Sequence, residues 1–222
     1  MDCSQLIEGV VKDKGTLAVL PGSVVTLFNS QGTQVAQTTV GADAAFKFEG
    51  LPCNEEYLAR AQKPSYISDE KKVATGAKGQ RREPTVLLLE IDEKELTPGK
   101  DLAKILDIPI IYFDLDKSNI RPDAEIELRK VITLLKQFPT IKIDVRSHTD
   151  SRAPYLYNEA LSGRRNKATI RYIVRTGGIA ANRITGKGYG EHNLVNNCSD
   201  GVNCTEAEHQ FNRRSEFIIL EK

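Results

Sequence analysis

The sequence has no apolar run long enough to cross a lipid bilayer. Its longest apolar runs, such as Val86–Leu89 and Ile108–Phe113, fall far below the ~20 residues that a spanning helix needs. It also lacks an excess of charge, since 31 Lys and Arg residues face 30 Asp and Glu residues, a net charge of +1. A nearly neutral chain creates no strong field for nucleic acid or acidic lipid. We therefore expect a globular chain with no membrane-spanning segment and no nucleic-acid partner.

Histidine is scarce as well, and the common catalytic motifs are missing. The chain contains only His148, His192 and His209, and it has no HExxH, GxSxG or CxxC pattern. Ser147 and Asp150 flank His148, but a catalytic triad forms by convergence in space and not by adjacency on an extended segment. His148 is expected to be a packed strand residue. These absences predict a protein that is not an enzyme, with no catalytic residue and no cofactor.

The four cysteines lack the spacing of a zinc ribbon or a redox motif. Cys3 and Cys53 bracket the first part of the chain, and Cys198 and Cys204 lie six apart in a polar loop. An even number of cysteines in loops predicts disulfides, which would stabilise the fold by about 4 kcal/mol for the large loop and about 2 kcal/mol for the small one. Disulfides belong to oxidising compartments.

No signal peptide precedes the first strand-like segment, because Met1-Asp2-Cys3 leads directly into it. Two interpretations compete: a cytosolic protein with four free thiols, or a fragment of a longer exported chain. The loop cysteines favour the exported fragment, so we expect a location outside the cytoplasm.

The first part of the chain, residues 1–92, alternates apolar and polar residues in short runs separated by turn residues such as Pro21-Gly22 and Gln31-Gly32. This spacing, without helical periodicity, predicts a small antiparallel β-sandwich of six or seven strands. The candidate strands are Leu6–Val11, Val24–Phe28, Val35–Val40, Phe46–Phe48, Tyr57–Ala61 and Val86–Ile91.

Several of these segments resemble the carboxypeptidase regulatory-like family of transthyretin-type sandwiches. The segments that carry the resemblance are Gly9-Val10-Val11, Leu20 to Leu27, Phe46-Lys47-Phe48 and Tyr57-Leu58-Ala59. The family usually has glycine shortly before its Phe-x-Phe strand, where this chain has Ala44-Ala45, so that turn is expected to differ. The resemblance implies no catalytic residue and suggests a spacer or a partner-binding module with exposed strand edges.

Residues 93–106 are charged and contain Pro98-Gly99, which predicts a linker between domains. In residues 107–222 the periodicity changes to β-α-β-α-β-β, which predicts a two-layer α/β domain with its helices on one face of the sheet. Leu128, Val131, Ile132 and Leu135 follow helical spacing, and Gly177-Gly178 provides a helix C-cap. The expected elements are a strand at Ile108–Phe113, a helix at Pro122–Phe138, a strand at Ile141–Val145, a helix at Asn158–Thr176 and strands at Ile184–Thr185 and Glu216–Leu220.

The densest group of polar residues lies between the second of these strands and the second helix. Asp150 follows the strand and Arg165 lies on the helix, so the two can converge where strand end meets helix start. An arginine can hold a carboxylate and an aspartate can accept from an ammonium, which together suit a group with an amine and a carboxylate on one carbon. The alternative is a structural salt bridge between Asp150 and Arg165 themselves.

A second resemblance favours ligand binding. The relevant motifs agree in order and spacing with the OmpA-like C-terminal domain, a family that includes the peptidoglycan-associated lipoprotein and the wall-binding half of flagellar stators. They are Phe113 to Ser118, His148-Thr149-Asp150, Tyr157-Asn158, Leu161-Ser162-x-x-Arg165, Gly188 to Glu191 and Asn212-Arg213-Arg214.

The resemblance implies that Asp150 and Arg165 grip the diaminopimelate of a peptidoglycan stem peptide. It also implies that Thr149, Asn158, Asp114 and Arg213 contribute to the pocket wall. Two features depart from the family pattern. The glycine that commonly follows the aspartate by three residues is Ala153, followed by Pro154, and Asn197 to His209 is expected to be an added loop near the site.

Three further patterns were considered as ligand sites. Asp114, Asp116, Ser118, Ile120, Pro122 and Glu125 match the ligand positions of an EF-hand loop, but Asn119 stands where glycine is needed and a strand precedes the segment, so no metal is expected. Gly186-x-Gly188-x-Gly190 lacks the GxGxxG spacing and is expected to be a turn. The basic stretch Arg164, Arg165, Lys167, Arg171 and Arg175 has helical spacing, which raises the hypothesis of nucleic-acid binding. A solvated helix face fits the near-zero net charge better for all of these residues except Arg165.

The sequence therefore predicts a periplasmic, outer-membrane-associated fragment that binds peptidoglycan and anchors an envelope protein or complex to the cell wall. The alternative is an envelope assembly scaffold whose β-sandwich makes the main protein contacts. The two-domain combination resembles the C-terminal part of larger outer-membrane-associated proteins, which include components of secretion machines (type IX among them) and gliding machines.

Overall fold

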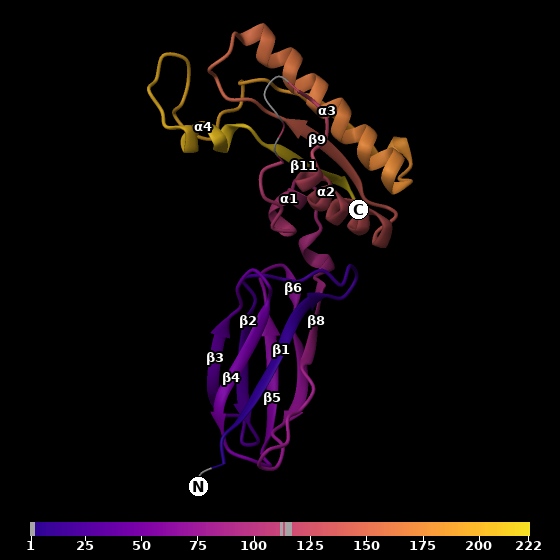
Figure 1. Ribbon diagram of the computed structural model, residues 1–222. Coiled ribbons are helices and arrows are strands. Elements are labelled where there is room, and N and C mark those ends of the chain that lie inside the picture. Colours follow the sequence, from indigo (N-terminus) through magenta and orange to yellow (C-terminus); the bar gives the residue numbers. More distant parts are fainter. Residues whose placement is uncertain (1–2, 112, 114–116) are drawn as a thin grey trace. The chain divides into compact units, whose positions relative to one another are not determined.

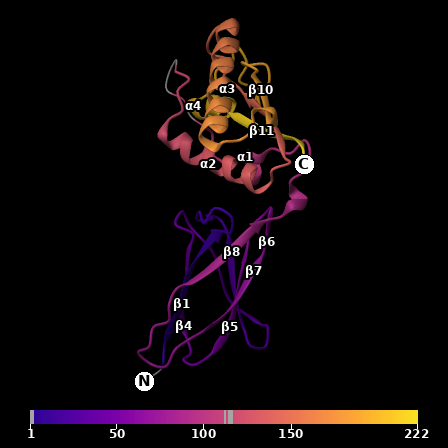
Figure 2. The ribbon, with the colours of Figure 1, turned by 90° about the vertical axis from the view of Figure 1, so that its right-hand side faces the viewer.

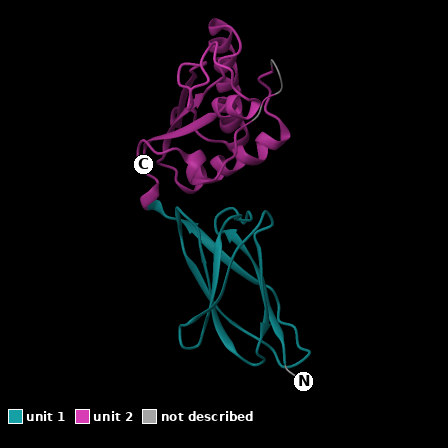
Figure 3. Cartoon of the chain, turned by 90° about the vertical axis from the view of Figure 1, so that its left-hand side faces the viewer, with its two compact units in different colours: residues 1–93 teal, residues 94–222 magenta. Residues whose placement is uncertain are grey.

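The structure is a computed structural model that describes residues 3–111, 113 and 117–222. The chain divides into two compact units, Met1–Glu93 and Lys94–Lys222, which Figure 3 colours separately. Within the described ranges, no helix has the length and apolar character needed to cross a membrane. We describe each unit by itself.

Unit 1 is a sandwich of two four-stranded sheets (Figures 1 and 2). One sheet has the order β4-β1-β8-β6 and the other the order β3-β2-β5-β7. This confirms the predicted all-β sandwich. The strands are β1 (Gln5–Asp13), β2 (Val24–Asn29), β3 (Gln34–Thr39), β4 (Ala45–Leu51), β5 (Glu56–Gln62), β6 (Tyr66–Ile67), β7 (Asp69–Ala74) and β8 (Thr85–Ile91).

Two features of this sandwich differ from the prediction. The sheets are not purely antiparallel, because β1 pairs in parallel with β8 while it pairs antiparallel with β4. The sequence also gave no sign of β6 and β7. The segment of β7 is Asp-Glu-Lys-Lys-Val-Ala, which does not alternate, since β7 lies at the edge of its sheet and none of its residues is buried.

The core of unit 1 lies between the sheets and contains alternate residues of most strands, such as Val25 and Leu27 of β2 and Leu87 and Leu89 of β8. Gly9 permits the close approach of β1 to its neighbours, since a Cβ atom there would lie 2.0 Å from the Thr85 carbonyl oxygen. A disulfide joins Cys3 and Cys53, next to the paired strands β1 and β4.

The turn before β4 keeps a backbone conformation that glycine commonly supplies. Ala44, at the position where the family usually has glycine, is fully buried and has a φ of 53°. A left-handed conformation costs a non-glycine residue about 1–2 kcal/mol. The turn is held by a hydrogen bond from the Ala44 amide to the Gly41 carbonyl and by another from the Ala45 amide to the Asp43 carboxylate.

Unit 2 is an α/β domain with a three-stranded sheet of order β10-β9-β11, which confirms the predicted fold class. β10 is parallel to β9 and β11 is antiparallel to it. Helix α3 packs against β9 and β10, α2 packs against α3, and α1 packs against β11. The elements are α1 (Leu102–Ile105), α2 (Pro122–Gln137), β9 (Lys142–Ser147), α3 (Tyr155–Gly177), β10 (Ile184–Gly188), α4 (Glu206–Asn212) and β11 (Ser215–Glu221), with single 3₁₀ turns at Glu93–Glu95 and Ala181–Arg183.

The two long helices follow their sequence signals. The four apolar residues predicted to form one face of α2 are all buried. Gly178, with a φ of 64°, is the C-cap of α3, as predicted. Helix α3 begins at Tyr155, three residues before the predicted start.

The element order differs from β-α-β-α-β-β in two places. The expected strand at Ile108–Phe113 is not formed by its described residues, which are Ile108–Ile111 and Phe113. The apolar character of this segment reflects burial of Ile111 and not strand pairing. The second difference is α4, whose segment we had included in a loop.

The predicted linker, residues 93–106, is mostly a packed part of unit 2. Leu96 and Leu102 are fully buried. The Asp101 carboxylate accepts hydrogen bonds from the amides of Ala103, 3.0 Å away, and of Phe217 in β11, 2.8 Å away. Charge and Pro-Gly therefore marked the boundary, but only tertiary contacts reveal that the following residues belong to the domain.

Candidate functional site

A cavity of about 520 Å³ lies where β9 ends and α3 begins. The segment after β9 contributes Thr149 and Asp150, and α3 contributes Asn158 and Arg165. Five of the six site residues predicted from the sequence thus line one cavity. The sixth, Asp114, lies outside the described residues. The remaining lining residues are Ile111, Phe113, Ser147, His148, Arg152, Ala153, Tyr157, Leu161, Glu206, Gln210, Arg213, Arg214 and Ser215.

Asp150 is a buried carboxylate held by two arginines. Arg152 donates to it from Nη2 at 2.8 Å, and Arg213 donates from Nη1 at 2.5 Å. The Arg152 amide donates to the other carboxylate oxygen, Oδ1, at 3.2 Å. Burial opposes the charged form, but the hydrogen bonds from Arg152 and Arg213 outweigh it and lower the pKa of Asp150. Asp150 is therefore ionised at neutral pH.

Arg165 is buried in the same cavity, with 9% of its surface exposed. Its Nε donates to the Lys117 carbonyl at 3.2 Å, and its guanidinium carbon lies 4.9 Å from the centre of the Phe113 ring. Burial lowers the pKa of Arg165, and the charge of Arg213 acts in the same direction. Arginine nevertheless stays charged at neutral pH, so the cavity contains a partly desolvated cation.

The ion pairs of Asp150 within the described residues run to Arg152 and Arg213 and not to Arg165. The sequence had left open a structural salt bridge between Asp150 and Arg165. In the structure, Asp150 and Arg165 do not form this salt bridge, and both side chains line the same cavity.

Asn158 organises the loop around the cavity. Its Nδ2 donates to the carbonyls of Asp150 at 3.0 Å and Ala153 at 2.9 Å, and also contacts the Glu191 carboxylate. These bonds fix the turn in which Ala153 stands where the family commonly has glycine. Pro154 then precedes the first residue of α3.

Several buried polar atoms that belong to lining residues have no hydrogen-bond partner in the described part of the chain. They are Ser147 Oγ, both ring nitrogens of His148, Thr149 Oγ1 and Gln210 Nε2. Buried polar groups are nearly always paired, so a cluster of unpaired ones around a cavity is characteristic of a site that a polar ligand completes.

Helix α4 supplies charged groups that the sequence had not assigned to the site. Glu206 accepts from Arg152 Nη1 at 2.7 Å and from Arg213 Nη2 at 2.5 Å, so Asp150, Arg152, Glu206 and Arg213 form one ion-pair network. Arg213 was predicted in the pocket wall, whereas Arg152 and Glu206 were not. The position of Arg152 two residues after Asp150 was the available signal for it. Glu206 could be found only from the fold.

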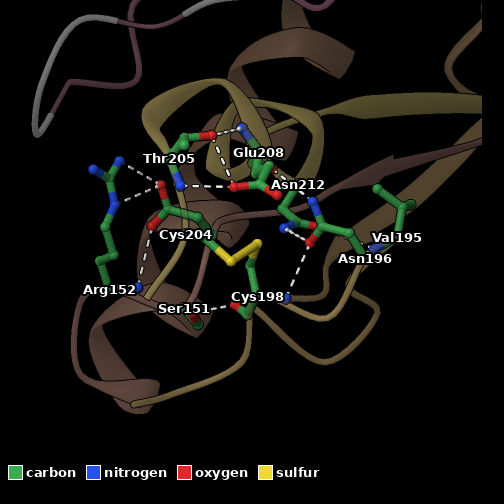
Figure 4. Close-up of a disulfide and its surroundings, with 10 residues drawn as sticks. Ser151, Arg152, Val195, Asn196, Cys198, Cys204, Thr205, Glu208 and Asn212 are labelled. Atoms are coloured by element: carbon green, nitrogen blue, oxygen red, sulfur yellow. Dashed lines mark hydrogen bonds and ion pairs between the residues drawn. A yellow bond between two sulfur atoms is a disulfide. The ribbon is translucent and has the colours of Figure 1, made fainter. Parts of the chain in front are cut away.

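The disulfide loop is close to this network, as expected for an added loop near the site (Figure 4). Cys198 and Cys204 are joined, and the Cys198 carbonyl accepts a 2.6 Å hydrogen bond from Ser151 Oγ. Thr205 and Glu208 form a capping box that begins α4 directly after Cys204. The loop is thus tied to the segment after β9 at one end and to α4 at the other.

The structure offers little support for a metal site. In the described ranges, the only suitable grouping is Cys198, Cys204 and Glu208, and the two sulfur atoms are joined to each other. Two ligands of the EF-hand pattern considered above, Asp114 and Asp116, lie outside the described residues.

Behind the cavity, His148 and Arg214 surround Glu216 of β11. His148 Nε2 lies 3.6 Å from Glu216 Oε2, and Arg214 Nη2 lies 2.7 Å from Oε1. The imidazole and the guanidinium lower the pKa of Glu216 to about 2. His148 also stacks on Tyr189, with ring centres 5.4 Å apart. His148 thus packs against Glu216 and Tyr189 directly after the end of β9, and not within the strand as expected, and it also lines the cavity.

Each of the two parts of the chain is similar to a known family. Residues 112–207 match the OmpA family, and residues 6–88 match the carboxypeptidase regulatory-like domain. Both resemblances expected from the motifs are confirmed.

Among similar proteins, the peptidoglycan-associated lipoprotein of Rhizobium meliloti is 36% identical over 94 residues, which cover 42% of this chain and 52% of that protein. Outer membrane porin F of Pseudomonas fluorescens is 36% identical over 109 residues, covering 49% of this chain and 32% of the porin. The matches thus span about half of the first relative and a third of the second. A solved structure, the peptidoglycan-associated lipoprotein from Burkholderia pseudomallei, is 24% identical with a TM-score of 0.45, covering 51% of this chain and 92% of that one.

Proposed function

We propose that unit 2 binds peptidoglycan non-covalently in the cavity around Asp150 and Arg165 and thereby anchors an envelope protein to the cell wall. The match to the OmpA family and the identity with a peptidoglycan-associated lipoprotein support this proposal. The two disulfides fit an oxidising compartment, in agreement with a periplasmic location associated with the outer membrane. The activity is binding and not catalysis.

The ligand group that fits best is the diaminopimelate of the stem peptide. The observation that carries this choice is that Asp150 and Arg165 line one cavity while the ion pairs of Asp150 run to other arginines. Arg165 would hold the carboxylate of the diamino acid. The Oδ1 atom of Asp150 would accept from its ammonium group, since Oδ2 already accepts from both arginines.

The unpaired polar atoms of Ser147, Thr149 and Gln210 would complete the contacts to the stem peptide. Charge-assisted hydrogen bonds contribute about 1.5–3 kcal/mol each, so a few of them give micromolar to millimolar affinity once ordering costs are included. Such affinity suits an anchor, because a wall offers many equivalent sites.

The test is co-sedimentation with purified sacculi. Arg165→Gln and Asp150→Asn should each weaken binding by at least about tenfold, since each removes one charge-assisted contact. Lys136→Gln, which removes an exposed charge on α2, and Asp200→Asn, in the disulfide loop, are the matched controls and should bind as the wild type does. Unchanged thermal melting would show that the variants still fold.

Competition identifies the ligand group. Free diaminopimelate should displace the protein from sacculi, whereas cadaverine, a diamine of the same chain length that has no carboxylate, should not. Equal displacement by both would contradict the role of Arg165. If the wild type does not bind sacculi at all, the anchor is wrong, and the scaffold in which the β-sandwich makes the main protein contacts becomes the better explanation.

A further inference from the structure

Helix α3 carries four basic residues on one exposed face, which we call the basic face: Arg164, Lys167, Arg171 and Arg175. Their spacing of three, four and four residues places them on one side of the helix. The face extends about 16 Å along the helix axis, at 1.5 Å per residue. Together with Ser118, Asn119 and Ile120 these residues line a second hollow of about 490 Å³.

Unlike several other arginines of unit 2, the members of the basic face have no acidic partner among the residues that the structure describes. Across the described ranges, none of the four side chains forms an ion pair with an Asp or Glu carboxylate. By contrast, Arg146, Arg152, Arg213 and Arg214 each contact a carboxylate. Like charges four residues apart repel and destabilise a helix slightly. Because the whole chain has a net charge of only +1, this is a local concentration of charge.

The basic face begins directly beside the candidate site. Arg164 and Arg165 are consecutive, and one lines each hollow. The segment 117–120 contacts both, because the Lys117 carbonyl accepts from Arg165 while Ser118, Asn119 and Ile120 line the second hollow. An extended ligand seated at Arg165 could therefore continue along α3.

We propose that the basic face is a second contact for the same wall polymer and binds carboxylates of stem-peptide residues beyond the one in the cavity. This inference rests on the proposed function. Three of the four residues are arginines, whose planar guanidinium groups match carboxylates in a bidentate way. A face of this length suits a polymer with several carboxylates better than one small anion.

The test compares sacculi with a small ligand. In Arg171→Gln/Arg175→Gln, affinity for sacculi should fall about three- to thirtyfold, as expected for two exposed charge pairs. The affinity of the double variant for sacculi should also depend less on salt concentration than that of the wild type. Binding of free diaminopimelate, which occupies only the cavity, should stay within about twofold of the wild type. Lys104→Gln/Lys136→Gln removes the same charge from exposed positions elsewhere in unit 2 and should leave both measurements unchanged.

Each outcome separates the two proposals. Suppose that Arg165→Gln abolishes sacculus binding but the double variant binds like the wild type at every salt concentration. Then the basic face does not contact the wall, and only this inference is wrong. If the wild type fails to bind sacculi, both proposals are wrong.

Vesicles containing phosphatidylglycerol test whether the basic face binds an anionic lipid surface instead. Binding to vesicles that the double variant loses, with sacculus binding intact, would overturn the inference in favour of a lipid surface.

Discussion

At the scale of single residues, the charges around the cavity are balanced by partners that come from other elements. Asp150 follows β9, whereas Arg213 and Glu206 come from the region of α4, 63 and 56 positions along the chain. Removing one member of such a network leaves buried charge without a counter-charge, which costs more than the pair itself contributes. Asparagine and glutamine substitutions are therefore better probes of this site than alanine.

Glu216 should make unit 2 sensitive to acid. Its pKa is lowered from 4.5 to about 2 by His148 and Arg214, so its stabilising effect is complete above pH 4.5 and is lost as the pH falls toward 2. The effect amounts to at most about 3 kcal/mol. Glu216→Gln should therefore reduce stability at pH 7 and flatten the loss between pH 4.5 and 2, as measured by urea unfolding monitored by circular dichroism.

The control for this experiment is Glu221→Gln, an exposed position on the same strand. It should follow the wild-type pH dependence. If Glu216→Gln also follows it, the ion pairs of Glu216 do not contribute to stability in acid.

At the scale of elements, β10 and α3 pack against each other at very close range. A Cβ atom at Gly188 would lie 2.2 Å from the Gly163 amide nitrogen and 2.4 Å from Ser162. The Ser162 hydroxyl also accepts from the Gly190 amide at 2.8 Å. The expectation of a turn is wrong for Gly186 and Gly188, which lie in β10, and Gly188 marks a place where strand and helix approach too closely for a side chain.

Gly188→Ala and Gly163→Ala form a matched pair on the two sides of this contact. Gly188→Ala should lower the free energy of unfolding by more than about 2 kcal/mol, because the backbone atoms it meets cannot move aside cheaply. A Cβ at Gly163 meets nothing within 4 Å, so Gly163→Ala should stabilise α3 by up to about 1 kcal/mol. Thermal melting measures both, and equal effects of the two substitutions would contradict this account.

At the scale of the whole molecule, unit 2 begins earlier than predicted, at Lys94 and not after a linker that ends at residue 106. Residues 94–222 form one compact unit that includes the buried Leu96, Leu102 and Ile105. A fragment 94–222 should therefore fold cooperatively.

A fragment 107–222 should be less stable by at least about 4 kcal/mol, because it loses those three buried apolar side chains. It also loses the hydrogen bond from the Phe217 amide to Asp101. Urea unfolding of the two fragments provides the measurement. Equal midpoints would show that residues 94–106 are a linker after all.

The sequence by itself determined the class of each unit and indicated the candidate residues of the site. Strand alternation predicted the strands that contribute buried residues, such as β2 and β8, and helical periodicity predicted the buried face of α2, because burial of one face dictates the period of apolar residues. The resemblance to the OmpA-like domain grouped Asp150, Arg165, Thr149, Asn158 and Arg213, and all five line one cavity.

Only the tertiary structure decided which groups neutralise each other and which elements complete the cavity. Arg152 and Glu206 became partners of Asp150 and Arg213 because the disulfide loop brings α4 to the end of β9, a contact between distant segments that no local pattern encodes. For the same reason, the sequence did not predict the parallel pairing of β1 with β8 or the packing of residues 94–106 in unit 2. The local sequence determines which face of a helix or strand is buried, whereas the tertiary fold determines which other element packs against that face.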